Sequence, residues 1–231
     1  MIRAPLTALL LGTAAVIGAS GPAWAEPAAP VERVSVVRDD GGIHLRVADR
    51  PFMIRGMNWG YMPIGHNYRY DFWGNDDAFI ESVLEEEMGL LRAMGVNAIR
   101  QFSDVPPRWI AYIHKRFGIY TVVNHLFGRY GFTVNGTWVS STNYQDPEHR
   151  KAILDSVIQS AETYRETPGV LLYLLGNENN YGLEWTSFEI ENLPKDERHK
   201  AKAQYLYSLF GEAVDHIHRV DPNRPVSLAN G

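Results

Sequence analysis

Short apolar runs of strand length alternate with amphipathic stretches along most of this chain. The strands expected from this pattern cover residues 52–58, 96–102, 119–126, 170–177 and 226–228. The helices expected between them cover residues 77–94, 107–117, 147–166 and 200–220. Regular alternation of strands and helices is typical of a parallel sheet whose crossover connections are right-handed. The pattern therefore predicts an α/β fold.

Local signals support several of these boundaries. Asn75 or Asp76 can cap the first expected helix and Gly95 can end it, while Asp146 before Pro147 has the composition of a helix start. Ahead of the first strand, residues 34–46 alternate between apolar and polar positions around a turn at residues 39–42. This alternation predicts a small β-hairpin.

The most informative segment is the apolar run from Val170 to Leu175, which ends abruptly in Gly176, Asn177 and Glu178. A continuous apolar run of this length is typical of a strand that is buried on both faces. Parallel strand–helix arrays bind their ligands at the carboxyl ends of the strands. Glu178 is therefore a candidate catalytic carboxylate.

The connections between the expected elements differ in length at the two ends of the strands. Helix-to-strand joints are short, whereas three strand-to-helix loops are long, namely residues 60–76, 127–146 and 179–199. Long loops in a compact domain are usually functional or disordered, and the many aromatic residues here argue against disorder. Sugar rings pack their C–H faces on aromatic rings, so these loops favour a carbohydrate-binding cleft. The alternative is that the rings only pack the loops onto the sheet.

The first 25 residues are expected to be an export signal and not part of the fold. Arg3 precedes an apolar segment at residues 6–18, and Ala23-Trp24-Ala25 resembles a cleavage site. We therefore expect an exported protein, periplasmic or extracellular, without a membrane span. The chain has no cysteine, so no disulfide is available. A net charge of -5 gives no electrostatic reason to expect nucleic acid binding.

Three segments resemble a known group of enzymes. Gly176-Asn177-Glu178 at the end of a fourth strand resembles the acid/base motif of the clan A glycoside hydrolases, and residues 168–182 are similar to the catalytic barrel of glycoside hydrolase family 2. Residues 50–58 resemble the first strand of that barrel, and residues 95–100 resemble its second strand. The resemblance implies a (β/α)8 TIM-barrel type of fold, of which about the first five strands are present after the hairpin.

The resemblance also implies roles for individual residues. Glu178 would be the general acid and base of a retaining mechanism, and Asn177 would bind the sugar 2-hydroxyl. Arg100 would orient the nucleophilic carboxylate. Substrate binding is expected from a further set of residues at strand ends and in the third loop, namely Asn58, Trp59, His125, Tyr181 and Trp185.

The second catalytic carboxylate has no counterpart in these residues. In the family it ends the seventh strand, and the acidic residues Glu184, Glu189 and Glu191 do not match it. We therefore expect a signal peptide at residues 1–25, an extension with the hairpin at 26–50, and the amino-terminal part of a barrel at 51–231. The C-terminal half of that barrel would be missing.

The sequence predicts no metal ion and no cofactor. His216 and His218 would point to different faces of a helix, and there is no phosphate loop or serine-nucleophile elbow. The expected function is hydrolysis of O-glycosidic bonds in a β-linked oligosaccharide or polysaccharide. Two alternatives stay open, a β-glucan transglycosylase and a non-catalytic carbohydrate-binding or scaffold protein.

Overall fold

The computed structural model describes residues 30–102, 104–183, 185 and 187–231. The expected signal peptide lies outside the described residues, so export stays a prediction. Within the described ranges, no helix combines the length and apolar character that crossing a bilayer requires.

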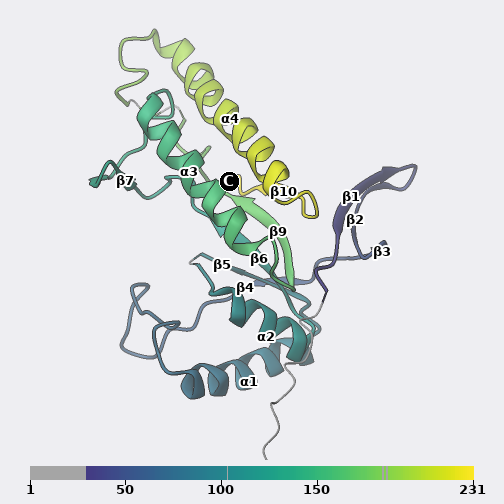
Figure 1. Cartoon of the computed structure of the whole chain (residues 1–231). Coiled ribbons are helices and arrows are strands. Elements are labelled where there is room, and N and C mark those ends of the chain that lie inside the picture. Colours follow the sequence, from purple (N-terminus) through teal and green to yellow (C-terminus); the bar gives the residue numbers. More distant parts are fainter. Residues whose placement is uncertain (1–29, 103, 184, 186) are drawn as a thin grey trace, which may run out of the picture.

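Five parallel strands form the central sheet, in the order in which they occur along the chain (Figure 1). They are β4 (Gly56–Asn58), β5 (Ala98–Gln101), β6 (Tyr120–His125), β9 (Val170–Leu175) and β10 (Val226–Leu228). This confirms the predicted parallel α/β arrangement. The edge strands β4 and β10 do not pair with each other, so the described residues form an open sheet and not a closed barrel.

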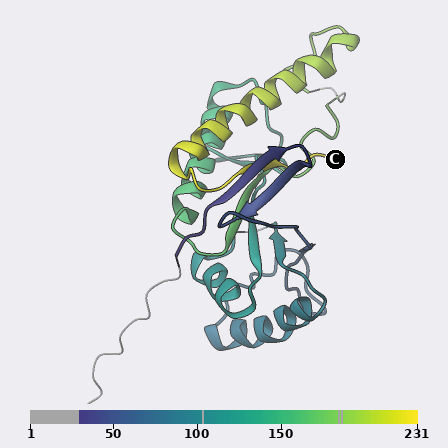
Figure 2. The same cartoon turned by 90° about the vertical axis from the view of Figure 1, so that its right-hand side faces the viewer.

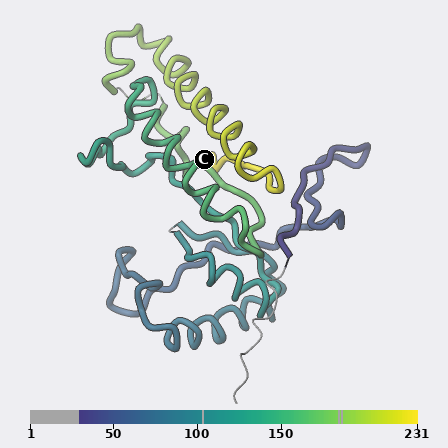
Figure 3. Tube along the Cα trace, in the orientation of Figure 1, coloured from purple at the N-terminus to yellow at the C-terminus, as the bar shows by residue number. Residues whose placement is uncertain are grey.

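Four helices connect these strands. They are α1 (Asp77–Ala93), α2 (Pro107–Phe117), α3 (Pro147–Tyr164) and α4 (Lys195–Val220). The predicted caps are confirmed, since Asp76 accepts from the backbone of Phe79 and Asp146 accepts from two backbone N–H groups of α3. Helix α4 begins five residues before the expected position, because acidic Asp196 and Glu197 favour a helix start at Lys195. Helix α1 packs beside α2, and α3 beside α4 (Figure 3).

The two faces of the sheet bury different groups. One face packs against all four helices in the main apolar core, which contains Ile99, Val123 and Tyr173 from the strands. The opposite face contributes Ala98, Val122, Leu171 and Leu172 to a smaller cluster with Val34 and Val47 of the hairpin. Because a strand points successive side chains to opposite faces, neighbouring residues in β5 and β6 face alternately the helices and this second face, which we call the inner side. In β9, both Leu171 and Leu172 lie on the inner side, because the register between β6 and β9 shifts by one residue at Thr121 and Val122.

The predicted hairpin is present as β1 (Val34–Asp39) and β2 (Gly42–Val47), followed by the short β3 (Arg50–Pro51). It lies near the amino ends of the sheet strands, where the backbone N–H of Val34 donates to the carbonyl of Asn223 at 2.8 Å. Figure 2, which views the molecule from the side of the hairpin, shows β1 and β2 crossing in front of the sheet. The loops that precede α1 and α3 lie at the other end of the molecule (Figure 1).

Two local features differ from the expected pattern. The first strand pairs only at Gly56–Asn58, because the side chain of Asn97 binds the backbone N–H of Arg55 at 2.8 Å and the carbonyl of Met53 at 2.9 Å instead. The long loop after β6 contains an additional hairpin, β7 (Phe132–Val134) and β8 (Thr137–Val139). Its turn at Asn135 and Gly136 has φ angles of 47° and 79°, which are typical of a two-residue hairpin turn.

Candidate active site

Polar side chains from neighbouring strands meet at the carboxyl end of the sheet. Arg100 at the end of β5 donates from Nε to Oδ1 of Asn124 at 2.8 Å and from Nη2 to Oδ1 of Asn177 at 2.8 Å. Asn124 is buried near the end of β6 and donates to the carbonyls of Leu174 at 3.1 Å and Gly176 at 2.9 Å. The structure therefore brings the predicted residues Arg100 and Asn177 into direct contact, and Asn124 binds the same guanidinium.

The amide of Asn177 is held in one orientation. Its Oδ1 accepts from Arg100, and its Nδ2 donates to the hydroxyl of Tyr130 at 2.6 Å. An amide nitrogen carries two hydrogens, so one donor of Nδ2 remains for another acceptor. Tyr130 comes from the loop after β6, and this loop therefore contacts the residue next to Glu178.

Glu178 is the third residue after β9 and has a positive φ of 56°. Such a backbone conformation is uncommon for a residue with a side chain, and strained positions of this kind cluster at functional sites. The backbone N–H of Glu178 donates to the carbonyl of Ala229 at 2.7 Å, and its side chain is exposed. Burial lowers the pKa of Arg100 below its ordinary value, while Tyr130 and the carboxylate of Glu178 act in the opposite direction. The carboxylate thus lies within electrostatic reach of the guanidinium.

A buried asparagine holds the turn that carries these residues. Asn179 is 6% exposed, and its Oδ1 accepts from the backbone N–H of Asn177 at 2.7 Å. Its Nδ2 donates to the carbonyl of Phe127 at 3.0 Å and to the hydroxyl of Tyr144 at 2.8 Å. A Cβ on Gly176, which has a φ of 82°, would stand only 2.5 Å from Oδ1 of Asn179. Glycine at this position therefore lets Asn179 approach the turn.

Three of the other predicted binding residues lie on the same side as Glu178. Asn58 is exposed and is the register partner of Arg100, and both line the same hollow on the inner side of the sheet. The backbone N–H of Tyr181 donates to the carbonyl of Glu178 at 2.9 Å. Trp185 contacts Tyr181 edge to face, with 5.4 Å between the ring centroids, and both rings are exposed.

The structure does not bring Trp59 to this group. Its indole is 8% exposed and packs against Phe72 in the helix-side core, while Nε1 donates to Oε2 of Glu87 on α1 at 2.5 Å. Trp59 follows Asn58, so the alternation of side chains places the two residues on opposite faces. The tryptophan joins the first strand end to α1.

His125 also faces the helices. Its Nδ1 accepts from the backbone N–H of Phe127 at 3.2 Å, so the neutral ring carries its hydrogen on Nε2, which lies 2.9 Å from Oγ of Ser156 on α3. Burial lowers the pKa of His125 to about 4. The ring therefore donates to Ser156 and is not available as a base for that hydroxyl. The side chain that β6 contributes to the inner face is Asn124 instead.

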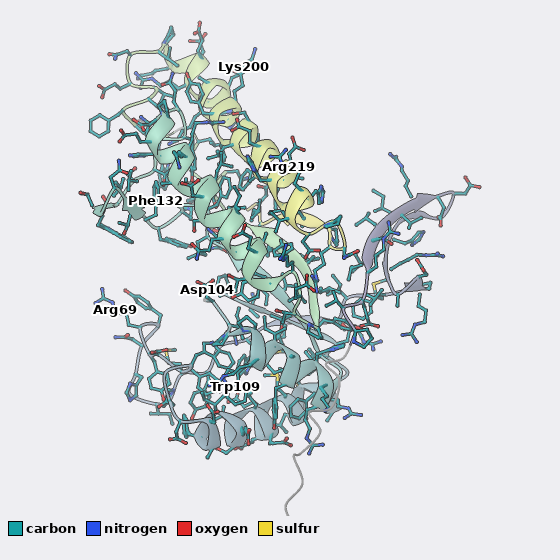
Figure 4. The ribbon with its side chains drawn as sticks, in the orientation of Figure 1. Arg69, Asp104, Trp109, Phe132, Lys200 and Arg219 are labelled. Atoms are coloured by element: carbon teal, nitrogen blue, oxygen red, sulfur yellow. The ribbon has the colours of Figure 1, made fainter. Side chains whose placement is uncertain are left out.

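The loops beyond the strand ends frame this group. Figure 4 shows Arg69 from the loop before α1 and Phe132 from the loop before α3 on the same side of the molecule. Across the described ranges, no group of three or more His, Cys, Asp or Glu side chains is arranged to hold a metal ion. The polar groups described at this end of the sheet are the Glu178 carboxylate, the Arg100 guanidinium and the oriented amides of Asn124 and Asn177.

Comparisons with known proteins give a structural match without a sequence match. No family model matches the sequence, and no curated protein matches it. The GH2 β-galacturonidase from Eisenbergiella tayi bound to galacturonate aligns with a TM-score of 0.56 and 14% identity, over 85% of this chain and 28% of that chain. The β-glucuronidase of Parabacteroides merdae aligns with a TM-score of 0.54 and 17% identity, over 84% and 20%.

A third solved structure is similar to this chain at an equally low sequence identity. The β-glucuronidase of Bifidobacterium dentium complexed with coumarin-3-O-glucuronide aligns with a TM-score of 0.54 and 18% identity, over 85% of this chain and 26% of that chain. The chain thus spans between 20% and 28% of the length of these three proteins. At such identities the likeness shows the fold alone, and the chain has an α/β fold like that of part of these glycosidases.

Proposed function

We propose that this chain belongs to a glycoside hydrolase of family 2 in clan A, which cleaves O-glycosidic bonds of a β-linked glycan with retention. The observation that carries the proposal is the contact between Arg100 and Asn177 beside Glu178 at the carboxyl ends of β5 and β9. The activities named for the similar structures, which are those of β-glucuronidases and a β-galacturonidase, support a carbohydrate substrate.

Glu178 is the proposed general acid and base. In a retaining mechanism it protonates the leaving glycosidic oxygen and then removes a proton from the water that releases the glycosyl-enzyme intermediate. The exposed carboxylate next to the strand end is accessible to both partners. The free Nδ2 donor of Asn177 supports its proposed contact with the sugar 2-hydroxyl.

The nucleophilic carboxylate would come from a segment outside these 231 residues. A retaining pair requires about 5–5.5 Å between the two carboxyl groups, so that segment would complete the barrel beside Arg100. Arg100 would then orient the incoming carboxylate and keep it ionised. Asn58, Tyr181 and Trp185 stay in the proposed substrate site, whereas the contacts of Trp59 and His125 favour a structural role for both.

The proposed place of action is the periplasm or the exterior of the cell. It is supported by Arg3, the apolar segment at residues 6–18 and the Ala23-Trp24-Ala25 signature. We propose the matching domain limits as well: a signal peptide at residues 1–25, an extension with the hairpin at 26–50, and the amino-terminal part of a barrel at 51–231.

The test is the substitution Glu178→Gln in the complete enzyme. We expect hydrolysis of β-glycosides with poor alkyl leaving groups to fall about 10²- to 10⁴-fold, because the amide cannot protonate the departing oxygen. Dinitrophenyl glycosides, which need no protonation of the leaving group, should form the glycosyl-enzyme intermediate at close to the original rate. Glu191→Gln, an exposed carboxylate of the same loop, is the matched control and should change neither rate.

Undiminished turnover of alkyl glycosides by the Glu178→Gln enzyme would refute the assignment. Products in which a sugar hydroxyl replaces water as the acceptor would identify a transglycosylase. Binding without any turnover by the unaltered complete protein would identify a non-catalytic carbohydrate-binding protein and would overturn the proposal.

A further inference from the structure

Two exposed tryptophans, one in the loop after β6 and one in the loop after β9, lie directly on glycine residues. Trp138 on β8 is 64% exposed, and a Cβ on Gly131 would come within 2.6 Å of its indole ring. Trp185 is 56% exposed, and a Cβ on Gly182 would also come within 2.6 Å of its ring. Both glycines have positive φ angles, 94° and 81°. In each case the absence of a side chain lets the indole rest on the loop backbone.

Each of these glycines follows a tyrosine that contacts the candidate active site. The hydroxyl of Tyr130, which precedes Gly131, accepts from Nδ2 of Asn177. The backbone N–H of Tyr181, which precedes Gly182, donates to the carbonyl of Glu178. The same Tyr-Gly unit with a tryptophan resting on the glycine therefore occurs in two different loops. One unit connects to Asn177 and the other to Glu178.

The β7–β8 hairpin explains why Trp138 is exposed. Phe132 pairs with Val139, and these side chains lie on the hairpin face that also includes the buried Val134. The ring of Phe132 contacts that of His149 on α3, with 5.5 Å between centroids. Trp138 pairs with Thr133, and both are exposed on the opposite face. The hairpin is thus anchored to α3 by one face and presents the indole on the other.

A tryptophan with such exposure is unusual, because aromatic side chains normally gain stability by burial. A ring supported on one side by backbone leaves one flat face free and loses little conformational freedom when a ligand covers that face. A pyranose ring matches such a face, because its axial C–H groups form a flat apolar surface. Tyr181, whose ring lies at 81° to that of Trp185, and Thr133, which pairs with Trp138, add polar groups for hydroxyls.

We propose that Trp138 and Trp185 are stacking subsites for two sugar rings beyond the one that is cleaved, so that the substrate is an oligosaccharide or polysaccharide and not a small-aglycone glycoside. This inference rests on the proposed function and names its substrate class. Trp138 is the new binding residue, and Gly131 and Gly182 are the residues that position the two platforms.

The test compares Trp138→Ala and Trp185→Ala with the unaltered complete protein in calorimetric titrations. The probes are β-1,3-linked and β-1,4-linked glucopentaose, chitopentaose and the corresponding 4-nitrophenyl monosaccharides. We expect each substitution to weaken binding of the pentasaccharide that the protein prefers by about five- to tenfold, with less than a twofold change for the monosaccharides. Tyr207→Ala, an exposed aromatic residue on α4, is the matched control and should leave all affinities unchanged.

Gly131→Ala is a second variant that keeps the tryptophan but displaces it, because the new Cβ would also lie 2.7 Å from the carbonyl oxygen of Val139. It should weaken pentasaccharide binding in the same direction as Trp138→Ala. Circular dichroism and thermal melting would establish that each variant is folded. A pentasaccharide affinity that neither tryptophan substitution alters, or equal losses for monosaccharides and pentasaccharides, would overturn the inference.

The result of this binding test can be distinguished from the result of the test of the proposed hydrolytic function. Glu191→Gln, which alters neither the proposed catalytic carboxylate nor a stacking surface, should leave pentasaccharide affinity unchanged. A protein that binds pentasaccharides through Trp138 but has no hydrolytic activity would support the stacking subsites and refute the proposed hydrolytic activity. If the protein is a hydrolase and its pentasaccharide affinity does not change in Trp138→Ala or Trp185→Ala, the proposed function is supported and the stacking subsites are refuted.

Discussion

Arg100 donates to Asn177 across 2.8 Å, although the two residues are 77 positions apart in the chain. The contact joins the ends of β5 and β9, which are separated in the sheet by β6. Asn124 at the end of β6 accepts a second bond from the same guanidinium at 2.8 Å. One arginine thus connects three strand ends beside Glu178, and the orientation of the candidate site depends on this connection.

Tyr130→Phe should weaken catalysis without weakening the fold. The substitution removes the acceptor for Nδ2 of Asn177, so the amide can rotate away from the orientation proposed to bind the sugar. One hydrogen bond contributes about 1 kcal/mol, so we expect kcat/KM of the complete enzyme to fall about fivefold, mainly through kcat. Because Tyr130 is 57% exposed, the free energy of unfolding should change by less than about 0.5 kcal/mol.

The control for this prediction is Tyr68→Phe, which removes an exposed hydroxyl from the loop before α1. Steady-state kinetics and urea denaturation of both variants supply the measurements. An unchanged kcat/KM for Tyr130→Phe would show that its hydroxyl does not orient Asn177.

Asn179→Ala should destabilise the fold strongly. It removes the partner of the Asn177 backbone N–H, the Phe127 carbonyl and the Tyr144 hydroxyl in a buried setting. Unsatisfied buried groups cost about 1–3 kcal/mol each, and partial relaxation leads us to expect a total loss of about 3 kcal/mol. Urea denaturation measures this loss as a lower midpoint with an unchanged slope.

The neighbouring asparagine provides the comparison. Asn180 is half-buried and binds the backbone of Gly231, so Asn180→Ala should cost less than about 1 kcal/mol. Equal losses for the two alanine variants would contradict the central role of Asn179 in the turn.

Stability should fall as the pH decreases from about 6.5 to about 4, in part through His125. Its pKa is about 4 in the folded protein because of burial, whereas an unfolded histidine has a pKa of about 6.5. Between these values the unfolded state binds a proton that the folded state does not. The contribution of His125 to the free energy of unfolding is therefore fully present above about pH 6.5. About 3 kcal/mol of this free energy is lost by pH 4.

His125→Gln isolates this contribution, because glutamine keeps a donor for Ser156 but does not titrate. Burial also lowers the pKa of His114, so the informative quantity is the difference between the two proteins. Urea denaturation at several pH values should show a steeper loss for the unaltered protein. Parallel curves for the two proteins would contradict the lowered pKa of His125.

Local patterns were sufficient for most of the secondary structure. Caps such as Asp76 and Asp146 act within one helical turn, and α2 and β10 have the boundaries that their sequences predict. The short pairing of the first strand was not predictable, because it depends on the side chain of Asn97, about 40 residues away. The β7–β8 hairpin was also missed, although Asn135 and Gly136 are residues typical of a two-residue hairpin turn.

The sequence by itself determined the order of the elements and the position of Glu178 at a strand end, because periodicity and capping are local properties. Only the tertiary structure decided that Asn124 faces Arg100 while His125 faces α3, and that Trp59 is buried against α1 while Asn58 lies on the inner side. A parallel strand that is buried on both faces has no alternation of polarity from which its inner side could be read. The face of each side chain therefore depends on the register with neighbouring strands, which forms only when distant segments pack together.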